Sequence, residues 1–308
     1  MEKNEAVGAR SMAPALQDGG LQRNDRRFGW VLTAPGLLAL SMVVLFPLFF
    51  TIFTSAFDYT LLHRSYDTFV GLENYESAFA LNYFGESLWV TLKFVVAVVI
   101  TEFLIGFTVA LMLNAVTRFK DVYYLILLMP LLINPVVVAL IWRMFLHPEL
   151  GIVNYLLSLI GIGPVNWLGD ARTAFWTVVL VDIWHQVSFM IILLLAGLSA
   201  LPREPYEAAR MDGASTLQAF FYVTLPLMRP VIVVTLLIRL IFAVKTFDLV
   251  FIMTRGGPGT ATDLVSYFIY RSAFFGLNIG QASAISVVLL VIVLGLTGYL
   301  YRYMRSLA

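Results

Sequence analysis

The chain has 308 residues, of which 60% are hydrophobic and only 13% carry a charge. A soluble domain of this length averages about 25% charged residues, so the composition indicates an integral membrane protein. The formal net charge is +1 and there are no cysteines, which excludes disulfides and thiolate chemistry, and scattered basic residues leave no footprint for nucleic acid. The three histidines are too dispersed to predict a metal site.

Six long apolar runs predict six transmembrane helices, because each has at least the ~20 residues that a helix needs to cross the hydrocarbon core. Lipid offers no partners for backbone groups, so these runs form helices and not strands. The fold class is therefore an all-α membrane protein. The expected spans are roughly Trp30–Phe57, Ser87–Leu113, Val122–Leu146, Ala174–Leu201, Val231–Met253 and Gln281–Tyr301.

The polar segment 1–29 has no hydrophobic period, and we expect it to be a disordered cytoplasmic tail whose Arg23, Arg26 and Arg27 meet anionic membrane lipid. The first apolar run is too long for a signal peptide, so it is read as a retained span that opens the transmembrane domain 30–308. With the N-terminus inside, the cytoplasmic segments carry twelve Lys and Arg residues and the outer loops carry four. This asymmetry places both termini in the cytoplasm.

The third span contains Pro130, Asn134 and Pro135. Two prolines interrupt the hydrogen-bond ladder and kink the helix. Such a kink either acts as a hinge for alternating access or is a static packing feature, and the sequence leaves both open. In the outer loop 147–173, glycines and a proline delimit a short helix near residues 153–160.

Polar and aromatic side chains form two stripes in the fourth and fifth spans. On insertion scales, a charged residue at the centre of a span costs ~2.5–3.5 kcal/mol, so its presence indicates a functional or structural role. Side chains that offer hydrogen bonds and rings are what a sugar site requires, and helix–helix contacts are the alternative. The candidate residues are Asp182, His185, Gln186 and Phe189 on one helix face, and Phe242, Lys245 and Asp248 at steps of three, with Lys245 and Asp248 placed to pair.

Four other intramembrane charges, Lys93, Glu102, Arg143 and Arg239, stand outside these stripes. Lys93 and Arg143 lie nearer the span ends, where long basic side chains reach the interface. Glu102 lies deeper. The first and last spans carry no charge, so we expect them to face lipid or to flank the core.

The cytoplasmic loop 202–230 is polar and helix-prone between two apolar runs. Pro205 fits the first turn of a helix, and Asp212-Gly213 is a stop signal. Ser215 or Thr216 can cap a second helix, which Pro226 and Pro230 would end. From the residue pattern alone, the alternative is an amphipathic helix that lies at the membrane interface and only connects two spans.

This loop carries the string Glu207-Ala208-Ala209, then Asp212-Gly213-Ala214, then Phe220 and Leu225-Pro226. The string resembles the EAA loop of the membrane subunits (permeases) of binding-protein-dependent ABC importers. The resemblance implies a coupling helix that docks on an ATPase subunit. Glu207 would be the acidic contact and Gly213 the turn, with Ala208, Ala209, Asp212 and Ala214 supporting them.

Two further stretches resemble the carbohydrate class of these permeases, related to the maltose and glycerol-phosphate systems: residues 254–258, TRGGP, and residues 262–274, TDLVSYFIYRSAF. The resemblance implies a location in the plasma (bacterial inner) membrane. It also implies a second, different permease, an ATPase dimer, an extracytoplasmic solute-binding protein and a sugar or polyol as solute. The chain has no phosphate-binding loop and no catalytic constellation, so we expect no enzyme activity and no cofactor in it, with ATP and Mg bound by the ATPase. An ion- or proton-coupled secondary transporter is the alternative.

Overall fold

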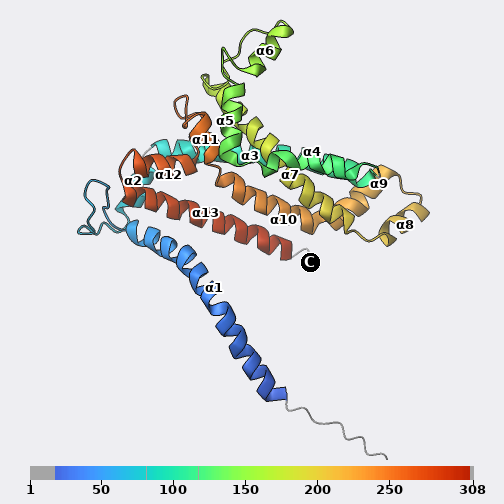
Figure 1. Ribbon diagram of the computed structural model, residues 1–308, viewed down its shortest axis with the longest axis horizontal. Helices are drawn as coiled ribbons and strands as arrows, with labels where there is room; N and C mark the ends of the chain where they lie inside the picture. Colours follow the sequence, from blue (N-terminus) through green and yellow to red (C-terminus); the bar gives the residue numbers. More distant parts are fainter. Residues whose placement is uncertain (1–17, 81, 117, 306–308) are drawn as a thin grey trace, which may run out of the picture. The chain divides into compact units, whose positions relative to one another are not determined.

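The computed structural model describes residues 18–80, 82–116 and 118–305, and helices account for most of them (Figure 1). Two isolated β-bridges join Phe57 to Phe69 and Thr60 to Asn278, and these described ranges contain no β-strand. The predicted all-α class is confirmed. The chain divides into two compact units, Met1–Phe50 and Thr51–Ala308.

Helix α1, Asp18–Thr54, contains the first apolar run and carries Pro35 and Pro47 within it. Its segment Phe28–Thr54 is long and apolar enough to cross a membrane. The predicted disordered tail ended at residue 29. Its residues 1–17 lie outside the described part of the chain, but residues 18–29 are helical, because Leu, Gln and Arg among them favour helix and extend the span that follows.

Four long helices form the centre of the second unit, and they correspond to the second, fourth, fifth and sixth predicted spans. They are α3 (Asn82–Ala115), α7 (Ala171–Ser199), α10 (Leu225–Val244) and α13 (Ile279–Arg305). α3 packs along α7, and α10 contacts α3, α7 and α13 (Figure 1). Buried Phe94, Val98, Phe107, Met190 and Leu194 fill the spaces between these helices. Their apolar surfaces therefore bury one another.

The third span is broken and not merely kinked. Helices α4 (Lys120–Leu132) and α5 (Pro135–Phe145) meet at an angle of 92°. Ile133 is extended, and the Asn134 side chain accepts a hydrogen bond from the Val136 amide, which caps α5 with Pro135 in its first turn. The predicted continuous span 122–146 is therefore replaced by two helices, because Asn134-Pro135 starts a new helix more readily than it continues one.

The fifth span also differs from the expectation. It begins earlier, with α10 at Leu225 and Pro230 inside the helix, and it stops at Val244. Residues 245–247 separate it from α11 (Asp248–Met253). The Thr246 carbonyl, freed by this break, accepts a hydrogen bond from the Ser266 hydroxyl. Because the freed carbonyl has a hydrogen-bond partner, the break leaves this buried polar group satisfied.

Shorter helices complete the second unit: α2 (Glu73–Ala80), α6 (Ile152–Leu159) and α12 (Val265–Phe274). α6 confirms the predicted short helix. Its buried Asn154 accepts a hydrogen bond from the Trp167 indole at 2.8 Å and donates to the Pro148 and Val165 carbonyls. In the part of the chain that the structure describes, five helices can span a membrane, or six if the bent pair α4–α5 counts as one span.

Candidate functional site

The loop after α7 forms a compact helix–turn–helix unit. Helix α8, Glu204–Met211, has Pro205 in its first turn as expected. It ends at Asp212, and Gly213 takes a φ of +77°. The Gly213 amide donates to the Arg210 carbonyl at 3.1 Å and the Ala214 amide to the Ala209 carbonyl at 2.9 Å. These two bonds are a Schellman motif, which explains why a glycine stands at this position.

The second helix is continuous with the next span. Ser215 caps α9 (Thr216–Ala219) through a reciprocal pair of hydrogen bonds with Gln218. A π-helical turn, η1 (Phe220–Thr224), then leads directly into α10. The prediction that Pro226 and Pro230 end this helix is wrong. Pro226 stands in the first turn of α10, and the π turn rearranges the hydrogen bonds that a proline would otherwise break.

Two contacts tie this unit to the membrane helices. The Tyr206 hydroxyl on α8 donates to the Thr224 hydroxyl in η1 at 3.0 Å, and Thr224 in turn donates to the Ala219 carbonyl. The rings of Phe220 in η1 and Phe107 in α3 lie 5.9 Å apart. A displacement of α8 therefore reaches α10 through one side-chain bond and a continuous helix.

The outer surface of the unit is exposed, since α8 and α9 contain no buried residue. The carboxylate of Glu207 borders a polar hollow of about 570 Å³, which Asn114 and Tyr206 also line. Met211 and Leu217 expose 88% and 68% of their area. Exposed apolar side chains beside an exposed carboxylate form the type of surface that docks another protein.

A buried ionic cluster joins α3, α7 and α10. Arg239 of α10 donates to both carboxylate oxygens of Glu102 on α3, one of them at 2.8 Å, and to Asp182 on α7. All three side chains are at most 4% exposed. The sequence identified each charge but not their partnership. The signal that could have found the cluster is the cost of an isolated charge inside a membrane span. Three charges on three adjacent helices avoid this cost when they pair with one another.

The stripe predicted on α7 divides between two roles. His185 is buried, and its Nε2 lies 3.0 Å from the Ile133 carbonyl, which the break between α4 and α5 leaves free. Its Nδ1 lies 3.0 Å from the Gln186 amide nitrogen. Asp182 is held by Arg239. Asp182 and His185 thus contact protein, whereas Gln186 and Phe189 are partly exposed.

The structure brings the two stripes together at one point, where the rings of Phe189 and Phe242 lie 5.6 Å apart. Lys245 is exposed and Asp248 half-buried. The regular steps of three from Phe242 to Asp248 do not persist, because α10 ends between them. Neither Lys245 nor Asp248 belongs to an ion pair among the described residues, so the predicted pair is not formed.

Two basic side chains near the span ends also find partners. Arg143 on α5 donates to the Ile252 carbonyl of α11 at 2.9 Å. The Lys93 ammonium lies 5.9 Å from the centre of the Trp89 ring and 5.5 Å from that of Phe175. Within residues 18–305, no group of three or more His, Cys, Asp or Glu side chains is arranged to hold a metal ion.

Comparison with known proteins decides between the importer and the secondary transporter. Residues 102–304 match the family described as binding-protein-dependent transport system inner membrane component. The chain belongs to this family. It is therefore a permease subunit of an ABC importer and a multi-pass membrane protein, and the secondary transporter is not favoured. The match includes the helix–turn–helix unit and both stripes.

Relatives agree over nearly the whole chain. The trehalose/maltose transport system permease protein MalF of Thermococcus litoralis is 36% identical over 90% of this chain and 93% of its own length. The sulfoquinovosyl glycerol transport system permease protein SmoG of Agrobacterium fabrum is 35% identical over 93% of each chain. The structure of a bacterial ABC transporter involved in the import of the acidic polysaccharide alginate is similar with a TM-score of 0.80 and 25% identity, covering 93% of this chain and 99% of that one.

Proposed function

We propose that this permease carries a sugar or a closely related solute inward. Relatives named for trehalose and maltose and for sulfoquinovosyl glycerol support this solute class. The observation that carries the proposal is the exposed α8–α9 unit, which is joined to a membrane helix through the Tyr206–Thr224 hydrogen bond. Such a unit serves a transporter whose energy is supplied by a separate chain.

The energy source is a separate ATPase dimer, which binds ATP and Mg and docks on the α8–α9 unit. Glu207 provides the acidic contact, Gly213 sets the turn, and Ala208, Ala209, Asp212 and Ala214 shape the surface around them. Exposed Met211 and Leu217 add the apolar contact that a docking surface needs. This chain itself acts as a transport subunit without enzyme activity, with both termini in the cytoplasm.

The solute path runs along the exposed parts of the two stripes. Gln186 offers hydrogen bonds, and the rings of Phe189 and Phe242 offer apolar faces on which a sugar ring can lie. Lys245 and Asp248 stand at the break that follows. Asp182 and His185 hold this wall from behind through Arg239 and the Ile133 carbonyl. A second permease, different from this one, closes the path, and an extracytoplasmic binding protein delivers the solute.

Uptake by the complete importer in proteoliposomes tests the energy source. We expect uptake to require the ATPase and ATP and to be insensitive to proton uncouplers. Uptake that continues without the ATPase would refute an ATP-driven importer and restore the proton-coupled carrier.

The coupling surface needs a separate test. Glu207→Ala should lower both ATPase retention and uptake. Glu204→Ala is the matched control, because Glu204 is an exposed glutamate in the first turn of the same helix and does not line the hollow beside Glu207. Equal behaviour of the two variants would contradict the role assigned to Glu207.

A further inference from the structure

Two adjoining hollows lie at the end of α7 that is farthest from the α8–α9 unit. The first, of about 550 Å³, lies between the N-terminal halves of α3 and α7, and its lining residues include Glu86, Trp89, Lys93 and Arg172. The second, of about 380 Å³, lies between α5, α6 and α7. Arg172 and Trp176 line both, so one ligand can occupy the two together.

The first hollow is cationic and aromatic. Lys93 lies over the rings of Trp89 and Phe175 and makes no ion pair among the residues that the structure describes, and the same is true of Arg172. Glu86 is the one carboxylate in the lining, and it accepts a hydrogen bond from the Thr260 hydroxyl at 3.2 Å. Among the described residues, the lining therefore carries two cations outside any ion pair and one hydrogen-bonded carboxylate. Asp170, whose charge interacts with that of Arg172, lies outside this lining, so the balance within it suits an anionic group.

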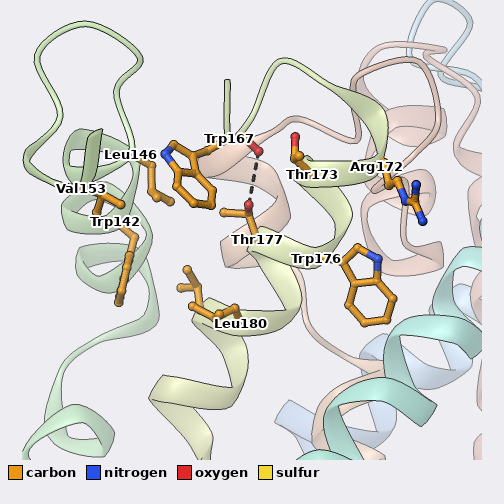
Figure 2. A pocket seen from close by; sticks show the side chains of 10 residues that line it. Trp142, Leu146, Val153, Trp167, Arg172, Thr173, Trp176, Thr177 and Leu180 are labelled. Atoms are coloured by element: carbon orange, nitrogen blue, oxygen red, sulfur yellow. Dashed lines mark hydrogen bonds between the residues drawn. The ribbon is translucent and has the colours of Figure 1, made fainter. Parts of the chain in front are cut away.

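The second hollow is almost wholly apolar on its accessible wall. Figure 2 shows Trp142 and Trp167 on one side of it, with Arg172 and Trp176 on the other. The Thr177 hydroxyl at its rim already donates to the Trp167 carbonyl. A sugar would find few free hydrogen-bonding groups here, whereas a hydrocarbon chain has no hydrogen bonds to lose on entering.

Exposed apolar side chains continue from both hollows along the helices. Trp176 and Leu180 on α7 expose 56% and 58% of their area, and Ile100 and Leu104 on α3 expose 55% and 59%. Both helices are candidate membrane spans. Four of the six tryptophans of the chain line the hollows, and tryptophan gathers where a span meets the headgroup layer. The hollows thus lie at headgroup depth above a hydrocarbon-facing surface.

We propose that the two hollows together bind one anionic phospholipid, with its phosphate between Lys93 and Arg172 and an acyl chain against Trp142, Trp176 and Leu180. The ligand must be amphiphilic, because a cationic and an apolar hollow share two residues. Under the orientation given above, the lipid belongs to the outer leaflet. The site does not depend on which solute is carried.

Lipid retention by the complete importer tests the site. The purified complex is equilibrated in mixed micelles that hold equal amounts of phosphatidylglycerol and phosphatidylcholine, and the retained lipids are counted by native mass spectrometry. A basic residue near a lipid surface contributes about a fivefold preference for anionic lipid. We expect the Lys93→Gln/Arg172→Gln double variant to lose roughly 25-fold in its preference for phosphatidylglycerol. Arg64→Gln, which removes an exposed cation of the 58–72 loop outside both hollows, should keep the preference.

Two further arms separate the lipid from other ligands. Trp176→Ala should lower the retention of both lipids together, because it opens the apolar wall and leaves the cations in place. Inorganic phosphate at millimolar concentration should not displace the retained lipid. The proposal is overturned if the double variant keeps the preference of the parent, if Trp176→Ala changes no retention, or if phosphate alone empties the site. Because retention is measured without transport, a failed uptake assay leaves this result unaffected.

Discussion

The ionic cluster of Glu102, Asp182 and Arg239 offers a sharp test of what holds the three central helices together. Arg239→Met keeps most of the apolar stem of the side chain and removes its charge. The two carboxylates then remain between α3 and α7 without a partner, at most 4% exposed. The expected loss of stability is therefore that of breaking a buried ion pair, and not that of a lost surface contact.

The size of the effect follows from the contacts. Removing one member of a buried ion pair costs about 3–5 kcal/mol, because the remaining charge is neither paired nor hydrated. Arg239 binds two carboxylates through three hydrogen bonds, so the loss should lie at the upper end of that range. The apolar triple variant Glu102→Met/Asp182→Leu/Arg239→Met leaves no charge behind, and such replacements are often neutral or stabilising.

Thermal unfolding of the purified complex in one detergent measures both variants. A loss of ~1 kcal/mol moves the midpoint by about 2–4 °C in a domain of 150–250 residues. Arg239→Met should therefore lower it by roughly 10–20 °C, and the triple variant should recover most of this. If Arg239→Met unfolds within about 2 °C of the parent, the cluster does not hold the helices. If the triple variant is as unstable as the single one, uncompensated charge is not the cause.

Other predictions concern the turn, the helix caps and pH. Gly213→Val should weaken assembly with the ATPase, whereas Gly213→Asn should be tolerated, and a pull-down with the ATPase measures both. The φ of +77° is accessible to asparagine and strained for a β-branched residue, and no neighbouring atom lies within 4 Å of the added Cβ. Ser215→Ala should destabilise the unit by about 1 kcal/mol, as loss of a helix cap does, which hydrogen exchange of α9 can detect. Hydrogen bonds from the α7 amides lower the pKa of Asp170, so its stabilisation is present above about pH 4 and is lost as the pH falls through that range. Burial raises the pKa of Asp263, although its partner Arg271 opposes the shift, so its contribution is greatest at low pH and is lost as the pH rises above about 4. Asp170→Asn and Asp263→Asn should each reduce the dependence of the thermal unfolding midpoint on pH near pH 4.

Much of the architecture could be predicted from the sequence because it depends on local patterns. Run length and hydropathy placed α3, α7 and α13, and the polar loop with Gly213 predicted a helix, a turn and a second helix. Each of these follows from residues close together in the chain. The family match then confirmed the importer, which rested on about twenty residues of that loop.

The breaks in the third and fifth spans were harder to predict because they depend on distant partners. The prolines showed that the third span could not be regular, but the 92° turn also relies on His185, 52 residues away, which contacts the Ile133 carbonyl. No residue next to Thr246 in the sequence signals that α10 ends at Val244. The Thr246 carbonyl that the break leaves free accepts its hydrogen bond from Ser266 on α12, which is distant in sequence. The partnership of Arg239 with Glu102 and Asp182 likewise joins residues more than 50 positions apart.

These long-range bonds also indicate which parts of the permease move together. A force on α8 passes through Tyr206 to Thr224 and along the continuous η1–α10 segment. α10 cannot slide against α3 and α7 without separating Arg239 from its two carboxylates. The Arg239 ion pairs therefore link the three helices, and we expect bending where the helices are interrupted, at residues 133–134 and 245–247. Both interruptions adjoin the proposed path, since His185 contacts the first and Lys245 stands in the second. A movement that starts at the coupling loop would thus change the shape of the path at these two breaks while the ionic cluster stays intact.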